Sequence, residues 1–326
     1  MSGSIIEFQQ VSKTFPNAKR PAVYETDLKI EEGTFVTILG TSGSGKTTLL
    51  KMVNRIHEPS TGNIFVQGEN TSKVSVTELR RKIGYVIQQI GLFPHMTIEE
   101  NIATVPKILK WDPKKISERI DFLLELVHLP PNEYRKRYPR QLSGGQQQRV
   151  GIARAMASDP EILLMDEPFG AIDAITRSKL QDELISIQKK LKKTVLFVTH
   201  DINEALKLGD KIIVMDQGRV QQYDTPLNIL LNPANEFVSR LVQSEDIIQL
   251  FSMLQAENVM VPLDKVKLNN PKVVKRHDDL KGILTLFLNS DIDGIIVENE
   301  NHQPVGAITF EQLKLNKSIK QVVVPS

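Results

Sequence analysis

The sequence has no cysteine, no long apolar run and almost no excess of charge of either sign. Without cysteine there can be neither a disulfide framework nor a thiolate metal site, which fits a reducing compartment without requiring one. The 41 basic side chains nearly balance the 39 acidic ones and leave a net charge of +2. This balance gives no sign of a nucleic-acid partner.

Apolar runs such as residues 162–165 are far shorter than the ~18 residues that a membrane-spanning helix needs. Residues 1–10 contain no basic segment followed by an apolar one, the pattern of a leader peptide. We therefore expect a soluble, cytoplasmic chain, so any membrane-spanning partner would be a separate polypeptide. A chain of 326 residues is long enough for one large and one small domain.

Short apolar stretches alternate with longer helix-forming ones over most of the chain, which predicts the buried parallel sheet of an α/β domain. The predicted buried strands are residues 34–39, 162–165, 194–199 and 211–215. Charged sequence with apolar residues near helical spacing predicts an inserted helical subdomain at about 97–160. We place the end of this first domain near residue 244, after an amphipathic segment at 237–242.

A glycine-rich loop follows the first predicted strand and precedes a predicted helix, and it reads Gly40-Thr41-Ser42-Gly43-Ser44-Gly45-Lys46-Thr47-Thr48. Its glycines let backbone N–H groups approach a phosphate chain, and the helix N-terminus adds its positive dipole end. Lys46 would pair with the β- and γ-phosphates, and the Thr47 hydroxyl would bind Mg²⁺. Taken alone, the pattern also permits a glycine-rich turn before a solvated lysine.

The strand at 162–165 leads directly into two neighbouring carboxylates, Asp166 and Glu167. Asp166 would hold Mg²⁺, and Glu167 would accept a proton from the attacking water. Without the upstream glycine loop, these two carboxylates would indicate only an ordinary helix start before Pro168.

A third motif lies at a predicted helix start, which suits an anion, and it reads Leu142-Ser143-Gly144-Gly145-Gln146. Together with the glycine loop, this pentapeptide resembles the ABC transporter ATPases. The resemblance implies a P-loop ABC ATPase domain at 1–244 that binds ATP and Mg²⁺ and hydrolyses ATP. It also implies a head-to-tail dimer with a second copy of the chain. In that dimer Ser143, Gly144, Gly145 and Gln146 face the partner's ATP.

The same resemblance assigns roles to single residues. His200, after a predicted strand, matches the family's switch histidine, which positions water and Glu167. Gln88 matches the glutamine that touches Mg²⁺ and water; its neighbour Gln89 leaves the register open, and the spacing to Phe93-Pro94-His95 selects Gln88. Asp173 matches a loop that communicates between the two ATP sites, although this chain reads Gly-Ala-Ile-Asp where Ser-Ala-Leu-Asp is common.

Phe15 is the matching position for an aromatic ring that stacks on adenine. Tyr24 is a weaker candidate, and plain core packing is an equal alternative for either ring. His95 fits a surface that meets a membrane subunit better than it fits a catalytic role.

The sequence pattern of residues 245–326 predicts a helix at 278–288, a hairpin of strands at 294–297 and 305–309, and a short final helix. They resemble one CBS motif, a small α+β regulatory module, with residues 317–326 as a partial second copy or a tail. A single motif would have to pair across the dimer. Nucleotide binding, ionic sensing and dimerisation alone all remain open.

The resemblance extends to importer ATPases with a C-terminal CBS region, which serve glycine betaine, carnitine and choline uptake. It implies separate permease subunits that contact the surface around residues 88–96, a substrate-binding protein or domain, and a place on the cytoplasmic face of the cell membrane. Ergothioneine or an amino acid is an alternative substrate. A non-transport ABC ATPase, which generally has two ATPase domains in one chain, and a ligand sensor are alternative functions.

Overall fold

The computed structural model describes residues 3–88, 91–170, 172–243, 251–252, 254–266 and 268–313. The chain divides into two compact units, Met1–Pro226 and Leu227–Ser326. The division falls at the start of helix α9 (Pro226–Leu231), earlier than the boundary predicted near residue 244. Residue 244 itself lies outside the described residues.

The first unit is built on a six-stranded sheet with the order β10-β9-β3-β8-β7-β6. Its strands are β3 (Phe35–Gly40), β6 (Ile83–Val86), β7 (Ile162–Asp166), β8 (Thr194–Thr199), β9 (Lys211–Asp216) and β10 (Arg219–Asp224). All pairs are parallel except β9 with β10. Every residue of β3, β7 and β8 is buried, as the continuous apolar runs predict, and all four predicted strands are present.

Two apolar cores cover the two faces of this sheet. Along β8, Val195 and Phe197 join one core, and Leu196 and Val198 join the other, because side chains alternate along a strand. The unit's helices outside the subdomain are α1 (Lys46–Val53), α2 (Val76–Arg81), α7 (Ala174–Leu191) and α8 (Ile202–Leu208).

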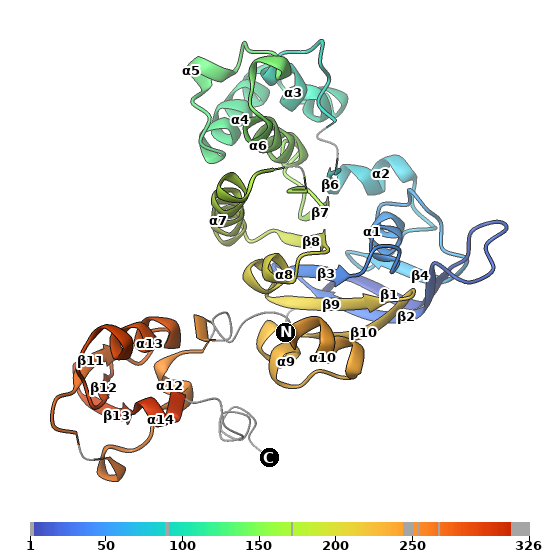
Figure 1. The fold of residues 1–326 in the computed structure, drawn as a ribbon. Coiled ribbons are helices and arrows are strands. Elements are labelled where there is room, and N and C mark those ends of the chain that lie inside the picture. Colours follow the sequence, from blue (N-terminus) through green and yellow to red (C-terminus); the bar gives the residue numbers. More distant parts are fainter. Residues whose placement is uncertain are drawn as a thin grey trace. The chain divides into compact units, whose positions relative to one another are not determined.

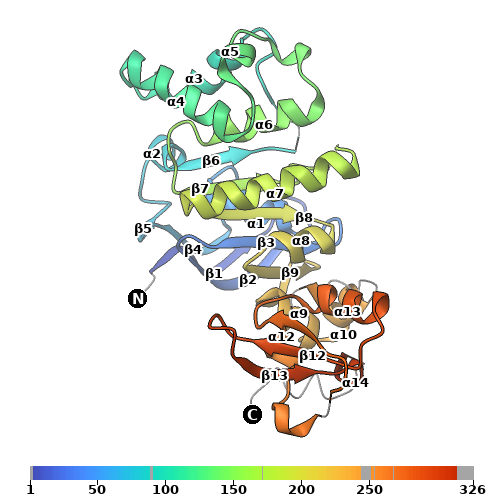
Figure 2. The ribbon, with the colours of Figure 1, turned by 90° about the vertical axis from the view of Figure 1, so that its left-hand side faces the viewer.

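A second, antiparallel sheet with the order β2-β1-β4-β5 was not predicted. Its strands are β1 (Ser4–Lys13), β2 (Val23–Glu31), β4 (Thr61–Val66) and β5 (Glu69–Asn70). Buried side chains from β1, β2 and β4 share a core with α1, and Figure 2 shows these strands beside α1 and β3. The sheet therefore supports the helix that follows the glycine loop.

The predicted helical segment consists of α3 (Ile98–Ile108), α4 (Pro113–Leu126), α5 (Pro131–Tyr134), the 3₁₀ helix η1 (Pro139–Gln141) and α6 (Gly144–Ala155). Thr97 and Glu100 form a capping box at the start of α3. Asp112 caps α4, and Pro113 occupies its first turn. Figure 1 shows these helices gathered at one end of the first unit.

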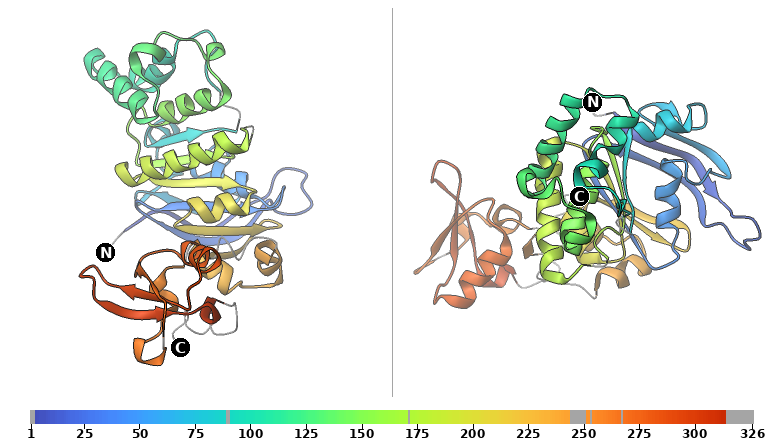
Figure 3. Two further views of the ribbon diagram at one scale, coloured as in Figure 1. Left: turned by 60° about the vertical axis from the view of Figure 1, so that its left-hand side comes forward. Right: turned by 90° about the horizontal axis from the view of Figure 1, so that it is seen from above.

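The second unit contains α9, α10 (Glu236–Gln243), α12 (Ala256–Val259), the 3₁₀ helix η2 (Leu263–Lys265), β11 (Lys272–Lys275), α13 (Leu280–Asn289), β12 (Ile295–Glu298), β13 (Pro304–Ile308) and α14 (Phe310–Leu313). Strand β12 pairs with β13 antiparallel and with β11 parallel, so the predicted helix, hairpin and helix are present and β11 is additional. Figure 3 shows this small sheet in orange and red. Residues 317–326 lie outside the described residues.

Within the described ranges, no helix combines the length and apolar character needed to cross a membrane.

The ring of Phe197 is fully buried and contacts two other rings of its core. The ring centroids of Phe35 and Phe169 lie 5.8 and 5.6 Å from it. Phe197→Ala should lower the free energy of unfolding by ~3–5 kcal/mol, because a cavity remains where the ring was. Urea denaturation measures this change, with Phe122→Ala as the control. Phe122 is 38% exposed, and its substitution should cost less than ~1 kcal/mol. Equal losses would contradict the assignment of Phe197 to the core.

Candidate functional site

The glycine loop joins the end of β3 to the first residue of α1. Gly43 and Gly45 have φ of +76° and +100°, a left-handed backbone that favours glycine. A Cβ atom on Gly40 would lie 2.1 Å from the Met215 carbonyl oxygen, and one on Gly45 would lie 2.4 Å from that of Ala22. The loop therefore needs glycine for both its conformation and its close packing.

Lys46 folds back over this loop. Its Nζ donates hydrogen bonds to the carbonyl oxygens of Gly40 at 2.8 Å and Thr41 at 2.9 Å, and the residue is 5% exposed. Burial lowers the pKa of the Lys46 ammonium, while the charges of Glu167 and Asp166 favour its protonated form. The cation is thus held beside the loop where the phosphates were predicted to bind.

Thr47 and Asp166, two of the predicted metal-binding residues, are in direct contact. The Thr47 hydroxyl donates to Asp166 Oδ1 at 2.8 Å, and Asp166 is 7% exposed at the end of β7. Their oxygen atoms are the kind of ligand that Mg²⁺ prefers. Tyr85 on the neighbouring β6 was not predicted; burial, and then the charge of Asp166, raises the pKa of its phenol, so it remains neutral beside the carboxylate.

The three residues predicted to be catalytic converge on one oxygen atom. His200 Nδ1 lies 3.2 Å from Glu167 Oε2, and Gln88 Nε2 lies 3.5 Å from the same oxygen. Glu167 has a left-handed backbone with φ of +44°, which is uncommon for a residue other than glycine. Its N–H donates to the Val198 carbonyl oxygen at 3.1 Å, which ties it to β8. Gln89, the alternative to Gln88, lies outside the described residues.

The cavity beside this cluster has a volume of about 30 Å³. Its lining residues are Glu167, Phe169, Gly170, Arg177, Thr199, His200, Asp201 and Glu204. This is room for roughly one water molecule, with polar groups on several sides.

The Ser143 motif forms the N-terminus of α6. The Ser143 hydroxyl accepts from Gln146 N–H at 3.3 Å, and Gln146 Oε1 accepts from Ser143 N–H at 3.0 Å. A Cβ atom on Gly144 would meet no heavy atom within 4 Å, so a ligand can approach the backbone there. Figure 1 shows α6 with the helical subdomain and α1 below it, so the structure does not bring this motif to the glycine loop of its own chain.

Among the described residues, Asp173 and Phe15 form no hydrogen bond, ion pair or ring contact with Glu167, His200 or Gln88. Asp173 caps α7 by accepting from Thr176 N–H at 3.0 Å, and this bond lowers the pKa of its carboxyl group. The Phe15 ring packs edge-on against His57 at 5.1 Å, with Lys13 Nζ 5.1 Å from its centroid. Phe15 is half-buried and belongs to neither apolar core of the unit, and its predicted adenine contact stays a prediction. Among the other predicted loop residues, Ser42 is exposed, Ser44 is buried and Thr48 is half-buried.

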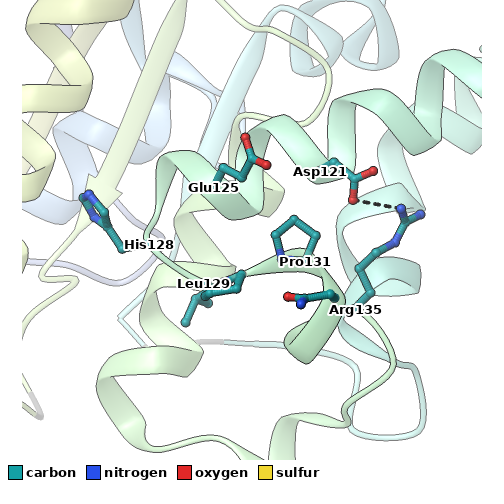
Figure 4. A pocket seen from close by; sticks show the side chains of 8 residues that line it. Asp121, Glu125, His128, Leu129, Pro131 and Arg135 are labelled. Carbon is teal, nitrogen blue, oxygen red and sulfur yellow. Dashed lines mark hydrogen bonds and ion pairs between the residues drawn. The ribbon is translucent and has the colours of Figure 1, made fainter.

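A wide concavity of about 830 Å³ lies on the helical subdomain, apart from all predicted site residues. Figure 4 shows Asp121, Glu125, His128 and Arg135 around it. The Arg135 guanidinium already donates to Asp121 at 2.8 Å, to Glu99 at 2.8 Å and to the Ser117 hydroxyl at 3.1 Å. Its charge is neutralised within the subdomain, so the concavity offers no unpaired cation to an anionic ligand.

Gly40→Ala should weaken ATP binding by tenfold or more, roughly, because the new methyl group displaces the loop from Met215 and misplaces its N–H groups. Titration with a fluorescent ATP analogue measures the change. Gly282→Ala is the matched control, since its Cβ atom would have its nearest neighbour at an ordinary 3.6 Å. Unchanged affinity in Gly40→Ala would contradict the assignment of this loop to the phosphates.

Comparisons with known proteins agree with this geometry. Residues 23–170 match the ABC transporter family model. The chain is 46% identical to the glycine betaine/carnitine/choline transport ATP-binding protein of Bacillus subtilis, over 98% of this chain and 82% of that one. It is 45% identical to the glycine betaine uptake system ATP-binding protein of Escherichia coli, over 95% of this chain and 99% of that one.

Solved structures give the same result for the fold. A dimeric ATP-binding cassette in a post-hydrolysis state, bound to ADP and phosphate, matches with a TM-score of 0.60 and 36% identity over 68% of this chain and 98% of that one. Part of an ABC transporter complex from Clostridium perfringens matches with a TM-score of 0.66 and 26% identity over 71% of this chain and 92% of that one. The chain therefore belongs to the ATP-binding proteins of ABC transporters and is an ABC ATPase.

Proposed function

We propose that this chain is the ATP-hydrolysing subunit of an importer for quaternary ammonium compatible solutes such as glycine betaine, carnitine or choline. The main support for ATP hydrolysis is that Gln88 and His200 converge on one oxygen of Glu167, close to the Thr47–Asp166 pair. The substrate class is supported by the names of the relatives.

ATP would bind with its phosphates on the glycine loop, against the N–H groups of Gly43, Gly45 and their neighbours. Lys46 would exchange its bonds to the Gly40 and Thr41 carbonyl oxygens for bonds to the β- and γ-phosphates. Thr47, Asp166 and Gln88 supply oxygen donors that fit Mg²⁺, which neutralises phosphate charge when bound.

Glu167 would take a proton from a water molecule as the water oxygen attacks the γ-phosphorus in line. The bond from that phosphorus to the bridging oxygen of ADP breaks, so ADP and inorganic phosphate are the products. His200, at 3.2 Å from Oε2, would hold the Glu167 side chain and the water in this geometry. The left-handed backbone of Glu167 is the kind of conformation found where a protein positions a reacting group.

A second copy of the chain would complete each ATP site. Ser143, Gly144, Gly145 and Gln146 lie at the start of α6, in the helical subdomain, so in this proposal they face the ATP on the partner's glycine loop. Asp173 would lie between the two sites. Dimerisation is supported by the dimeric cassettes of known structure, and the head-to-tail arrangement is the one in which each Ser143 motif would face the other copy's glycine loop.

The segment from Gly91 to Met96 is proposed to receive the permease subunits. Arg154 donates to the Gly91 carbonyl oxygen at 2.7 Å, and its guanidinium lies 5.8 Å from the Phe93 ring centroid. Phe93 is 40% exposed beside a groove of about 350 Å³. A fixed segment with an exposed aromatic ring suits a protein interface. In this proposal the chain acts at the cytoplasmic face of the membrane, in a system that also has a substrate-binding protein or domain.

Residues 245–326 are proposed as a CBS-like regulatory region. The observed order of α13, β12, β13 and α14 supports this proposal. A regulatory nucleotide is its proposed ligand.

Glu167→Gln should abolish ATP-driven uptake and slow hydrolysis by at least ~100-fold, while ATP still binds, because the amide cannot accept the water's proton. The measurement is uptake of labelled glycine betaine, carnitine and choline in cells that carry the complete transporter with either form of the chain.

Uptake lost only in the variant supports the proposal. If none of the three compounds is taken up although the ATPase activity is intact, the transported substrate is ergothioneine, an amino acid or a compound of another class. A variant that hydrolyses ATP at the wild-type rate would exclude Glu167 as the base.

Asn101→Ala should lower uptake several-fold more than it lowers the ATPase rate of the isolated chain. The Asn101 amide donates to the carbonyl oxygens of Phe93, Met96 and Thr97 and accepts from Phe93 N–H, so it fixes the proposed permease surface. Asn132→Ala, an exposed asparagine of the same subdomain, should change neither rate. Equal loss of uptake and hydrolysis in Asn101→Ala would show a general defect rather than a lost interface.

A further inference from the structure

Glu204 is a buried carboxyl group that the proposed mechanism does not use. It is 7% exposed and lines the same small cavity as Glu167 and His200. Helix capping does not explain its position, because the Asp201 side chain already accepts from the N–H groups of Asn203 at 2.9 Å and Glu204 at 3.2 Å. A glutamate at the third position of a helix often turns back to the N-cap N–H. Here that N–H, of Asp201, donates instead to the Thr199 hydroxyl at 3.0 Å.

The two carboxyl oxygens of Glu204 hold two different elements. Oε2 accepts from the Thr199 hydroxyl at 2.5 Å, and Oε1 accepts from Gln181 Nε2 at 3.0 Å. Burial raises the pKa of the Glu204 carboxyl, and both hydrogen bonds act in the opposite direction. A carboxylate is stable at such a site only with partners of this kind.

Thr199 directly precedes His200, and it is 2% exposed. Its hydroxyl donates to Glu204 and accepts from Asp201 N–H, so it closes a turn around the backbone of His200. The His200 side chain is itself 64% exposed, so packing does little to orient it. Two features hold the imidazole toward Glu167: its own contact with Oε2, and the turn closed by the Thr199 hydroxyl, which is bonded to Glu204.

The other partner, Gln181, is on α7, which begins at the Asp173 cap. One turn earlier on α7, Arg177 donates to the Ile172 carbonyl oxygen at 3.0 Å, and its Nη1 lies 3.8 Å from Asp201 Oδ2. Helix α7 thus contacts the His200 turn directly through Arg177 and, by way of Glu204, through Gln181.

We propose that Glu204 is a positioning residue for ATP hydrolysis: through the Thr199 hydroxyl it fixes the turn that presents His200 to Glu167, and through Gln181 it links that turn to the helix beginning at Asp173. This inference rests on the proposed roles of Glu167 and His200. Glu204 touches no reacting atom and acts through His200.

The test is ATP hydrolysis by the full chain with Mg²⁺-ATP, with kcat and KM measured separately. Glu204→Ala should lower kcat about tenfold or more and leave KM within about twofold, because geometry rather than ATP binding is lost. Glu204→Gln should keep most of the activity, since its Oε1 still accepts from Thr199 and the Gln181 amide can rotate to accept from the new NH₂ group. Thr199→Val, which replaces the hydroxyl by a methyl group, should lower kcat as Glu204→Ala does. Thr199→Ser, which keeps the hydroxyl, should have a kcat close to that of the wild type.

Gln188 provides a matched control for Gln181. It is on the same helix, is 8% exposed, and donates to the carbonyl oxygens of Gly33 at 2.7 Å and Lys193 at 3.1 Å. Gln181→Leu and Gln188→Leu both remove a buried amide, so thermal unfolding should shift in both. Only Gln181→Leu should lower kcat, and an equal fall in both variants would overturn the proposal.

A double substitution separates this inference from the proposed function. In His200→Ala, adding Glu204→Ala should change the single-turnover rate by less than about twofold, because the residue that Glu204 positions is already gone. A further tenfold fall would show that Glu204 acts independently of His200 and overturn the inference. If His200→Ala loses activity while Glu204→Ala and Thr199→Val keep the wild-type kcat, only the role of Glu204 is overturned. If His200→Ala keeps the wild-type rate, the proposed role of His200 is overturned and this inference with it.

Discussion

The parallel pairing of β6, β7, β8 and β3 is the constraint on which the whole site depends. Parallel strands end at one edge of their sheet, so residues that follow different strands meet there although they are far apart in the sequence. Gln88 follows β6, Glu167 follows β7, and His200 follows β8, while the glycine loop follows β3. The two apolar cores that bury both faces of this sheet therefore also fix the geometry of the polar residues at its edge.

Several polar groups at this edge are bonded to one another, although the buried Ser44 hydroxyl of the glycine loop has no hydrogen-bond partner among the described residues. Lys46 is bonded to carbonyl oxygens of its own loop, and Thr47 is bonded to Asp166. Buried polar groups need such partners. ATP and Mg²⁺ would therefore bind by exchanging existing hydrogen bonds for stronger charge-assisted ones, with little rebuilding of the backbone. The glycine conformations and the close contact of Gly40 with Met215 hold that backbone in place.

How much the sequence could predict differs between elements for physical reasons. Strands β3, β7 and β8 are buried on both faces, so their apolar runs are visible in the sequence. Burial is irregular along β1, and β11 buries only Val274, so their patterns are weak; β2 alternates buried and exposed residues, a strand pattern that our predictions did not use. The glycine loop, the Asp166–Glu167 pair and the Ser143 motif could be predicted because each is contiguous, whereas Gln88 and His200 are single residues that the family resemblance indicated.

Glu204 and Gln181 could not be predicted in this way, because each is a single polar residue in a helical stretch. Polar residues at such positions are usually exposed on a helix surface. Their burial results from packing between α7 and α8, which are distant in the sequence, and no local pattern records it. The same holds for Tyr85, whose neighbour Asp166 comes from another strand.

One segment of the chain connects the chemistry to the proposed permease surface. It begins at Gln88, whose amide lies 3.5 Å from Glu167, and continues to Phe93 and Met96, which Asn101 holds in place. Arg154, near the end of α6, binds the Gly91 carbonyl oxygen in the same segment, and α6 begins with the Ser143 motif. In the proposed ATP site and dimer, changes at the γ-phosphate and at the Ser143 motif would both reach this segment through these contacts. Because the segment also exposes Phe93, in the proposed transporter it would pass a movement at the ATP site directly to the membrane subunits.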